Sequence, residues 1–283
     1  MAPRRKRLRR FFRLACLQVN AGPDLGRNRD AVSLRLETAF RARPHLIALP
    51  ENFIWRGPSG NLEEVASQTP SVLKRFQTLA REHTCAFLLG SLIERSDDPN
   101  KFFNTSILIS ADGRVAARYR KIHLFDVSLE RVRTHESRHI IAGRRIVTGR
   151  VAGIPLGLTI CYDLRFPELF RVLAFRGCRI IFVPSNFTEE TGKAHWEILL
   201  RARAIENQVF IAAPAQVGVH PSTGIRSFGA SLVIDPWGRV LARGSRNREE
   251  VIVARLDLVE QGRLRQRFPV LKHCLPDPRG RGG

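Results

Sequence analysis

The sequence predicts an α/β fold, built as an α/β/β/α sandwich of two mixed sheets with internal pseudo-symmetry. Segments with strand-like alternation and segments with amphipathic helical spacing follow one another along most of the chain. Two stretches, 102–121 and 227–244, carry the same pattern of two β runs around a turn, so each half ends in a similar hairpin. A sheet with helices on one face must bury the other, and a second such sheet is the economical partner.

The first half of the chain supplies the elements of one such sheet. In order, the pattern predicts a strand at 13–20, a helix at 27–43 ended by Pro44, a strand at 45–49, a helix at 70–83, a strand at 85–92 and the hairpin at 102–121. The hairpin turns at Asp112-Gly113, a dipeptide that tolerates the left-handed backbone of a tight turn.

The second half repeats this plan around a single thiol. A β-favouring run at 158–160 stops at Cys161, and a helix is predicted at 169–176. Pro167 suits the first helical position, Glu168 suits the positive helix end, and Gly177 closes the helix. The closing hairpin at 227–244 turns at 235–238.

Length and composition predict one domain in a reducing compartment. With 283 residues and 43% hydrophobic content, the chain can bury a large core, and we expect a single domain over 13–283 with a C-terminal tail. Its five cysteines are odd in number and lack C-x-x-C spacing, which argues against a disulfide framework or a structural zinc site. We therefore expect a cytoplasmic location, and no apolar stretch is long enough to span a membrane.

The net charge of +21 raises the question of an anionic partner. Seven of the first thirteen residues are basic, and the other basic residues are scattered without interleaved aromatic residues. We interpret 1–12 as a basic, disordered arm, and any binding of nucleic acid would depend on it alone. The arm resembles a twin-arginine signal only superficially, because no sustained apolar segment follows.

Three reactive side chains each close or directly follow a β run: Glu51, Lys121 and Cys161. Because strand ends of a two-sheet fold converge at one edge, these residues form a candidate site with a base, a cation and a thiol nucleophile. The chain has 41 arginines and only six lysines, so composition alone does not explain a lysine at this place. The alternatives are a small buried thiol, a surface lysine and a solvated carboxylate.

A competing motif runs from His135 to His139. The sequence His-Glu-Ser-Arg-His satisfies H-E-x-x-H, in which two histidines on one helical face bind zinc. Its flanks are too polar before and too β-like after for a buried metal-binding helix, and no third-ligand pattern follows. We expect no metal there.

Four longer motifs carry a resemblance to a known family. LPENF at 49–53, YRKIHLFDV at 119–127, ICYDLRFPEL at 160–169 and the stretch 184–208 are similar, in order, to signatures of the nitrilase, or carbon-nitrogen hydrolase, superfamily. The similarity extends from about Leu14 to Pro276 and is greatest to its ω-amidase and deaminated-glutathione amidase branch. It implies the same sandwich fold and a homodimer formed through helix packing.

The resemblance also implies roles for individual residues. Glu51 matches the general base, Lys121 the lysine that stabilises the tetrahedral intermediate, and Cys161 the nucleophile. It further implies an oxyanion-binding backbone N–H at Tyr162, a second glutamate at Glu136, and substrate-binding residues Arg165, Phe187 and Thr191. The implied reaction is hydrolysis of a small carboxylate-bearing amide through a thioester, without metal or cofactor.

Departures from the branch leave the substrate open. Asn186 stands where a small alanine is common, and Arg144-Arg145 stand where acidic residues are common. The alternatives are hydrolysis of an N-carbamoyl amide or a nitrile on the same fold and, more distantly, a nucleic-acid-associated protein that uses the arm.

Overall fold

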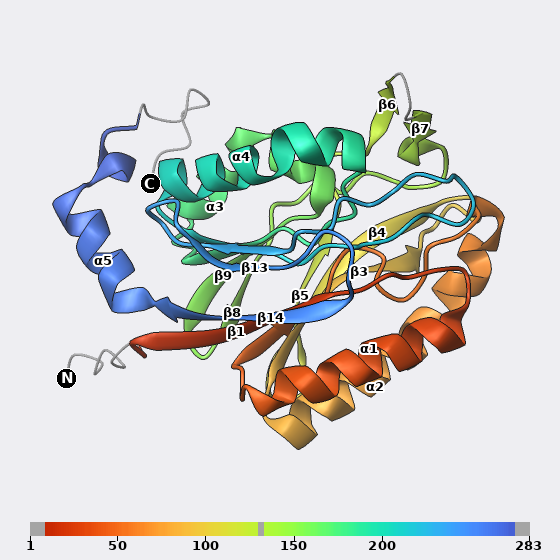
Figure 1. Cartoon of the computed structure of the whole chain (residues 1–283), viewed down its shortest axis with the longest axis horizontal. Coiled ribbons are helices and arrows are strands. Elements are labelled where there is room, and N and C mark those ends of the chain that lie inside the picture. Colours follow the sequence, from red (N-terminus) through yellow and green to blue (C-terminus); the bar gives the residue numbers. More distant parts are fainter. Residues whose placement is uncertain (1–8, 130–132, 275–283) are drawn as a thin grey trace.

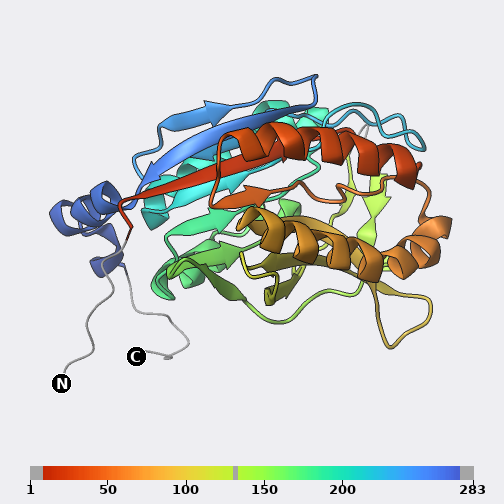
Figure 2. The same ribbon diagram turned by 90° about the horizontal axis from the view of Figure 1, so that it is seen from below.

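The computed structural model describes residues 9–129 and 133–274. Two six-stranded sheets pack face to face, and helices cover the outer face of each, as Figures 1 and 2 show. The predicted α/β/β/α sandwich is therefore confirmed. A small two-stranded sheet, β6 (Asp126–Ser128) and β7 (Arg133–His135), stands at one end of the molecule (Figure 1).

The first sheet has the strand order β14-β1-β2-β3-β4-β5. Its strands are β1 (Phe11–Gln18), β2 (Leu46–Ala48), β3 (Ala86–Arg95), β4 (Phe102–Ile109), β5 (Val115–Arg120) and β14 (Glu250–Asp257). β1, β2 and β3 are parallel, because α1 (Leu25–Arg41) and α2 (Leu62–His83) form the crossovers between them. The predicted hairpin is the antiparallel pair β4 and β5.

The second sheet repeats this arrangement, with the order β13-β12-β11-β10-β9-β8. Its strands are β8 (Thr148–Val151), β9 (Ile154–Leu158), β10 (Ile180–Phe182), β11 (Phe210–Ala213), β12 (Leu232–Ile234) and β13 (Val240–Arg243). Crossover helices α3 (Pro167–Phe175) and α4 (Glu189–Asn207) join the parallel strands β9, β10 and β11. The pair β12 and β13 is the second predicted hairpin, so the predicted repeat of one strand and helix arrangement in both halves is confirmed.

Alternation along the strands builds two apolar layers. On β1, Leu14 and Cys16 face the space between the sheets, whereas Ala15 and Leu17 face the helices. The inner layer joins residues of both sheets, and the outer layer of the first sheet packs against α1 and α2. Because both faces of the central strands are buried, these strands are apolar throughout, as parallel sheets require.

Most predicted boundaries shift by a few residues, and β9 ends at Leu158, where the predicted β run 158–160 begins; two further differences have a structural cause or consequence. Helix α2 begins at Leu62 rather than at Pro70, which lies inside it. The first turns bury Leu62 and Val65, and Thr69 Oγ1 donates to Ile93 O of β3 at 2.6 Å, so contacts with the sheet offset the backbone hydrogen bond that a proline removes. Strand β1 begins at Phe11, so residues 11 and 12 belong to the sheet; residues 1–8 of the expected arm lie outside the described part of the chain.

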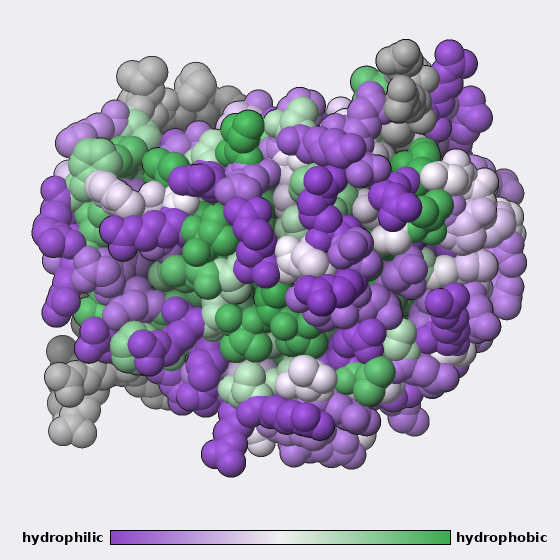
Figure 3. Space-filling view, viewed as in Figure 1, coloured by the Kyte–Doolittle hydropathy of each residue, from purple (hydrophilic) through white to green (hydrophobic). Residues whose placement is uncertain are grey.

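The chain ends in α5 (Leu258–Arg267) and a short 3₁₀ turn at Val270–Lys272. Figure 3 shows apolar side chains gathered among charged ones over the edge strands β13 and β14, where Leu241 and Val253 are exposed. The described cysteines are all free thiols. No helix in the described ranges combines the length and apolar character needed to cross a membrane.

Candidate active site

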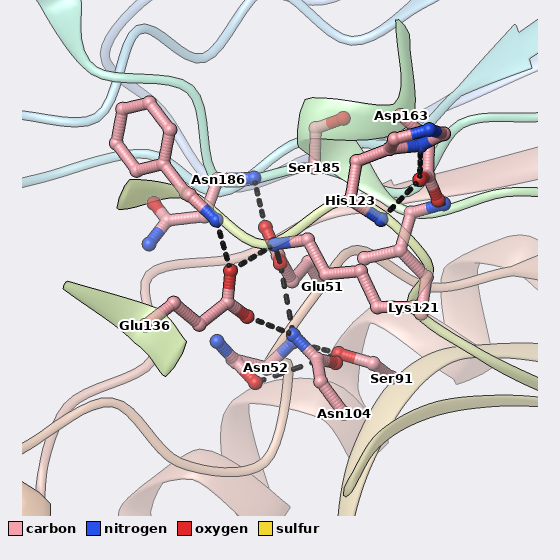
Figure 4. A network of polar contacts seen from close by, with 12 residues as sticks. Glu51, Asn52, Ser91, Asn104, Lys121, His123, Glu136, Asp163, Ser185 and Asn186 are labelled. Carbon is pink, nitrogen blue, oxygen red and sulfur yellow. Dashed lines mark hydrogen bonds and ion pairs between the residues drawn. The ribbon is translucent and has the colours of Figure 1, made fainter. Parts of the chain in front are cut away.

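The three residues predicted from strand ends do converge. Glu51 lies three residues after β2, Lys121 directly after β5, and Cys161 three residues after β9. All three are buried and line one cavity of about 620 Å³, together with Glu136. Figure 4 shows Glu51, Lys121 and Glu136 pointing toward one another from different segments.

Cys161 sits on a constrained turn. Its backbone φ is +47°, in the left-handed region that residues other than glycine rarely adopt. Its N–H donates to Pro184 O at 2.9 Å. The 3₁₀ turn Cys161–Arg165 begins there, so the N–H of Tyr162 is among the first N–H groups of a helical turn, which have no partner within the turn. This N–H can donate to an oxyanion that forms beside the thiol.

Lys121 is held between two carboxylates. Its Nζ lies 2.9 Å from Glu51 Oε1 and 2.8 Å from Glu136 Oε2, and its side chain is only 2% exposed. Burial alone would lower the pKa of Lys121, but the negative charges of Glu136 and Glu51 outweigh it and raise the pKa well above its ordinary value. Lys121 is therefore a fixed cation at neutral pH.

Further hydrogen bonds fix both carboxylates. Asn104 Nδ2 donates to Glu51 Oε1 and to Glu136 Oε1, each at 3.1 Å, and Phe125 N donates to Glu136 Oε2 at 2.8 Å. The backbone N–H of Asn186 donates to Glu51 Oε2 at 3.0 Å. These donors leave Glu51 little freedom to rotate away from the thiol.

The Cys161 thiol is protonated at rest. Burial raises its pKa well above the ordinary value, and the charge of Glu51 raises it further, while Lys121 and the backbone N–H of Asn186 oppose the shift. A nucleophile in this state needs a base within reach at the moment of attack. The Glu51 carboxylate is hydrogen-bonded to the thiol, so its position allows it to accept that proton.

The predicted substrate-binding residues do not line this cavity. Arg165 stacks near Phe187 and Tyr162, and its Nη1 lies 3.2 Å from His195 Nδ1. Phe187 packs on Trp196, and Thr191 bonds to Thr188 at the start of α4. None of the three is among the described residues that line the cavity. Their role in binding stays a prediction. Arg144 and Arg145 do not line it either.

The H-E-x-x-H segment does not form the helix that a zinc site of this kind needs. His135 ends β7, and Glu136–Arg138 is a single 3₁₀ turn. Glu136 instead contacts Lys121, as the resemblance implies. Across 9–129 and 133–274, no three His, Cys, Asp or Glu side chains cluster as metal ligands.

Three buried residues at the site were missed from the sequence: Arg56, Asn104 and Asp163. Asp163 accepts from Tyr119 Oη and from the backbone N–H groups of Ile160 and His123. The one available signal was its position two residues after Cys161 in a chain poor in acidic residues. Nothing in the local pattern marked Arg56 or Asn104.

A thiol, a carboxylate and a fixed cation around one cavity are the groups that a hydrolase working through a covalent intermediate requires. Comparison with known proteins agrees. The carbon-nitrogen hydrolase family matches residues 13–266. Deaminated glutathione amidase of Synechocystis is 37% identical over 264 residues, covering 92% of this chain and 96% of that protein.

Solved structures give the same picture. The crystal structure of the Caenorhabditis elegans NitFhit protein has a TM-score of 0.87 and 36% identity, covering 93% of this chain and 65% of that one. An amidase variant from Nesterenkonia sp. AN1, with the acetamide moiety of fluoroacetamide added at its active site cysteine, has a TM-score of 0.76 and 27% identity over 91% of this chain and 96% of that one. The chain belongs to the carbon-nitrogen hydrolase family, within the nitrilase superfamily, and is a hydrolase of carbon-nitrogen bonds other than peptide bonds.

Proposed function

We propose that this protein is an amidase that hydrolyses a small carboxylate-bearing amide through a thioester on Cys161. The observation that carries the proposal is the placement of Lys121 Nζ against Glu51 and Glu136, in a cavity that also holds the thiol. The similarity to deaminated glutathione amidases supports a substrate of the type of deaminated glutathione or α-ketoglutaramate.

In the first half-reaction, Glu51 removes the proton from Cys161 Sγ as the sulfur bonds to the amide carbon. The carbonyl oxygen becomes an oxyanion, stabilised by Lys121 Nζ and the N–H of Tyr162. Glu51 then gives its proton to the nitrogen, the C–N bond breaks, and ammonia or an amine leaves. A thioester remains.

In the second half-reaction, Glu51 takes a proton from water as its oxygen attacks the thioester carbon. The new oxyanion uses the same donors, the S–C bond breaks, and the sulfur regains a proton from Glu51. The products are a carboxylic acid and the free enzyme. Each side chain returns to its starting protonation state.

The test is amine or ammonia release from deaminated glutathione and from α-ketoglutaramate by the intact chain and by Cys161→Ala. Turnover by the intact chain and its loss in a folded Cys161→Ala variant is the expected result. Mass spectrometry of a quenched reaction should find the acyl group on Cys161. Turnover only of N-carbamoyl amides or nitriles would overturn the substrate class and retain the thiol mechanism.

We also propose a homodimer that buries the outer face of α3 and α4. Phe175, Ile198 and Ile205 expose 52%, 69% and 47% of their surface there, which is unusual for large apolar side chains on one monomer face. Ile198→Glu should convert a dimer to a monomer in light scattering. A monomeric intact chain would contradict this proposal.

A further inference from the structure

A buried guanidinium that the proposed mechanism does not use, that of Arg56, forms part of the cavity wall. Arg56 is only 2% exposed and lines the cavity that holds Cys161. Its nitrogens donate to Ala21 O, Asn186 Oδ1, Ser227 Oγ, Asn20 Oδ1, Val217 O and Val219 O. All these acceptors are neutral, so no carboxylate among the described residues hydrogen-bonds to this buried cation.

Arg56 fixes which way the Asn186 amide faces. A guanidinium can only donate, so the atom turned toward Arg56 Nη1, at 3.2 Å, must be the Asn186 oxygen. Ser227 Oγ also donates to this Oδ1, at 2.6 Å. The Asn186 Nδ2 group therefore points the other way, and no described residue accepts a hydrogen bond from it.

Asn186 stands at the reacting centre. It lines the cavity beside Cys161, and its backbone N–H contacts both Glu51 and the thiol. Figure 4 shows its backbone nitrogen against Glu51 and its side chain directed away from that carboxylate. Asn186 and Cys161 line the same cavity, so an amide held there for attack by Cys161 also meets the wall that Asn186 forms.

The loop at 217–220 supplies a further hydrogen-bond donor to this wall of the cavity. Arg56 Nη2 binds the carbonyls of Val217 and Val219 and so fixes the chain just before the half-buried His220, which lines the cavity. His220 Nδ1 accepts from Ser222 N at 3.2 Å, so the neutral ring carries its proton on Nε2. This wall of the cavity therefore presents two hydrogen-bond donors, Asn186 Nδ2 and His220 Nε2, close to the buried positive charge of Arg56.

We propose that Asn186 is a specificity-determining residue, held by Arg56 and Ser227 so that its Nδ2 donates to an oxygen of the acyl part of the substrate. The amides it selects carry a carboxylate or 2-oxo group, and plain aliphatic amides gain nothing from this donor. The inference rests on the proposed amidase function and names Asn186, rather than Arg165, as the contact that selects the anionic acyl group.

The decisive variant is Asn186→Asp. The aspartate keeps an oxygen toward Arg56 and Ser227 but replaces the cavity donor with an acceptor. The measurement is the ratio of kcat/KM for α-ketoglutaramate to that for butyramide, which removes any effect on Glu51 common to both substrates. We expect the ratio to fall about 10- to 100-fold, as for loss of one hydrogen bond to a charged acceptor, and a smaller fall for Asn186→Ala.

The rival assignment is tested beside it with Arg165→Ala. If that variant lowers the ratio and Asn186→Asp leaves it unchanged, the inference is overturned. Binding of 2-oxoglutarate to the Cys161→Ala chain, measured by calorimetry with and without Asn186→Asp, needs no turnover. Weaker binding to the chain with the aspartate supports the inference, and equal binding overturns it. If binding weakens but the intact chain hydrolyses neither amide, the inference stands and only the proposed function fails.

Discussion

Tyr119 and Asp163 join the two halves of the molecule beneath the active site. Tyr119 Oη donates to Asp163 Oδ2 at 2.7 Å, and both side chains are fully buried. Tyr119 lies on β5, two residues before Lys121, and Asp163 lies two residues after Cys161. The bond therefore ties the strand that carries the cation to the turn that carries the thiol.

Tyr119→Phe should weaken both folding and catalysis. It removes one of several donors to buried Asp163 and leaves Ile122 N without its acceptor, and loss of a buried hydrogen-bond partner costs about 1–3 kcal/mol. We expect a loss of free energy of unfolding in that range by urea denaturation, and a lower kcat. The control is Tyr162→Phe, since no described residue hydrogen-bonds to that hydroxyl. Equal stability of the two variants would contradict the prediction.

Strand β3 passes so close to the backbone just before Glu51 that position 90 has room only for glycine. A Cβ at Gly90 would lie 2.0 Å from Leu49 O and 2.4 Å from Pro50 O, both backbone atoms that cannot move alone. Gly90→Ala should therefore cost more than about 3 kcal/mol or prevent folding, as overpacking against a backbone does. The control is Gly60→Ala, where a Cβ meets no atom within 4 Å and the change should stay within about 0.5 kcal/mol. A soluble Gly90→Ala protein with unchanged stability would refute this account.

Local sequence pattern was enough to predict the layers and the convergence of Glu51, Lys121 and Cys161, because strand alternation, the two hairpin turns and strand-end placement are properties of short segments. The start of α2 was not accessible in this way, since its first turns depend on contacts with β3 that are remote in sequence. Arg56 was missed for the same reason: its acceptors come from residues 20–21, 186, 217–219 and 227. Nothing beside Arg56 in the sequence distinguishes it from the other arginines.

Stability should fall at alkaline pH because buried thiols resist ionisation. Burial raises the pKa of Cys85 to about 12 and that of Cys178 to about 11, and it raises the pKa of Cys16 and Cys161 as well. Since the unfolded chain loses these protons near pH 9 and the folded chain keeps them, the free energy of unfolding falls as pH rises above 9. Each such thiol contributes about 1.4 kcal/mol per pH unit.

Urea denaturation at pH 8, 9 and 10 under reducing conditions measures this slope. Cys178→Ala should make it shallower by one proton, because the unfolded chain then has one thiol fewer to ionise. A slope unchanged by the substitution would show that Cys178 does not stay protonated in the folded protein.

Lys121→Met should abolish catalysis and destabilise the fold, and the two effects have different causes. Removing the cation leaves Glu51 and Glu136 buried and unpaired, which costs about 3–5 kcal/mol. It also removes the donor that we propose for the oxyanion, and loss of such a donor lowers kcat about 10²- to 10³-fold. The double variant Lys121→Met/Glu136→Gln separates the two effects. With one carboxylate neutralised, much of the lost stability should return, because fewer unpaired charges remain in the interior.

Activity should stay low in the double variant, since no group replaces the Lys121 Nζ beside the reacting carbon. The measurements are urea denaturation and single-turnover kinetics on the same preparations, so that a folding defect is not taken for a catalytic one. Recovery of turnover together with stability would mean that Lys121 serves only to hold the two carboxylates in place. Recovery of stability alone would identify its charge as a stabiliser of the transition state.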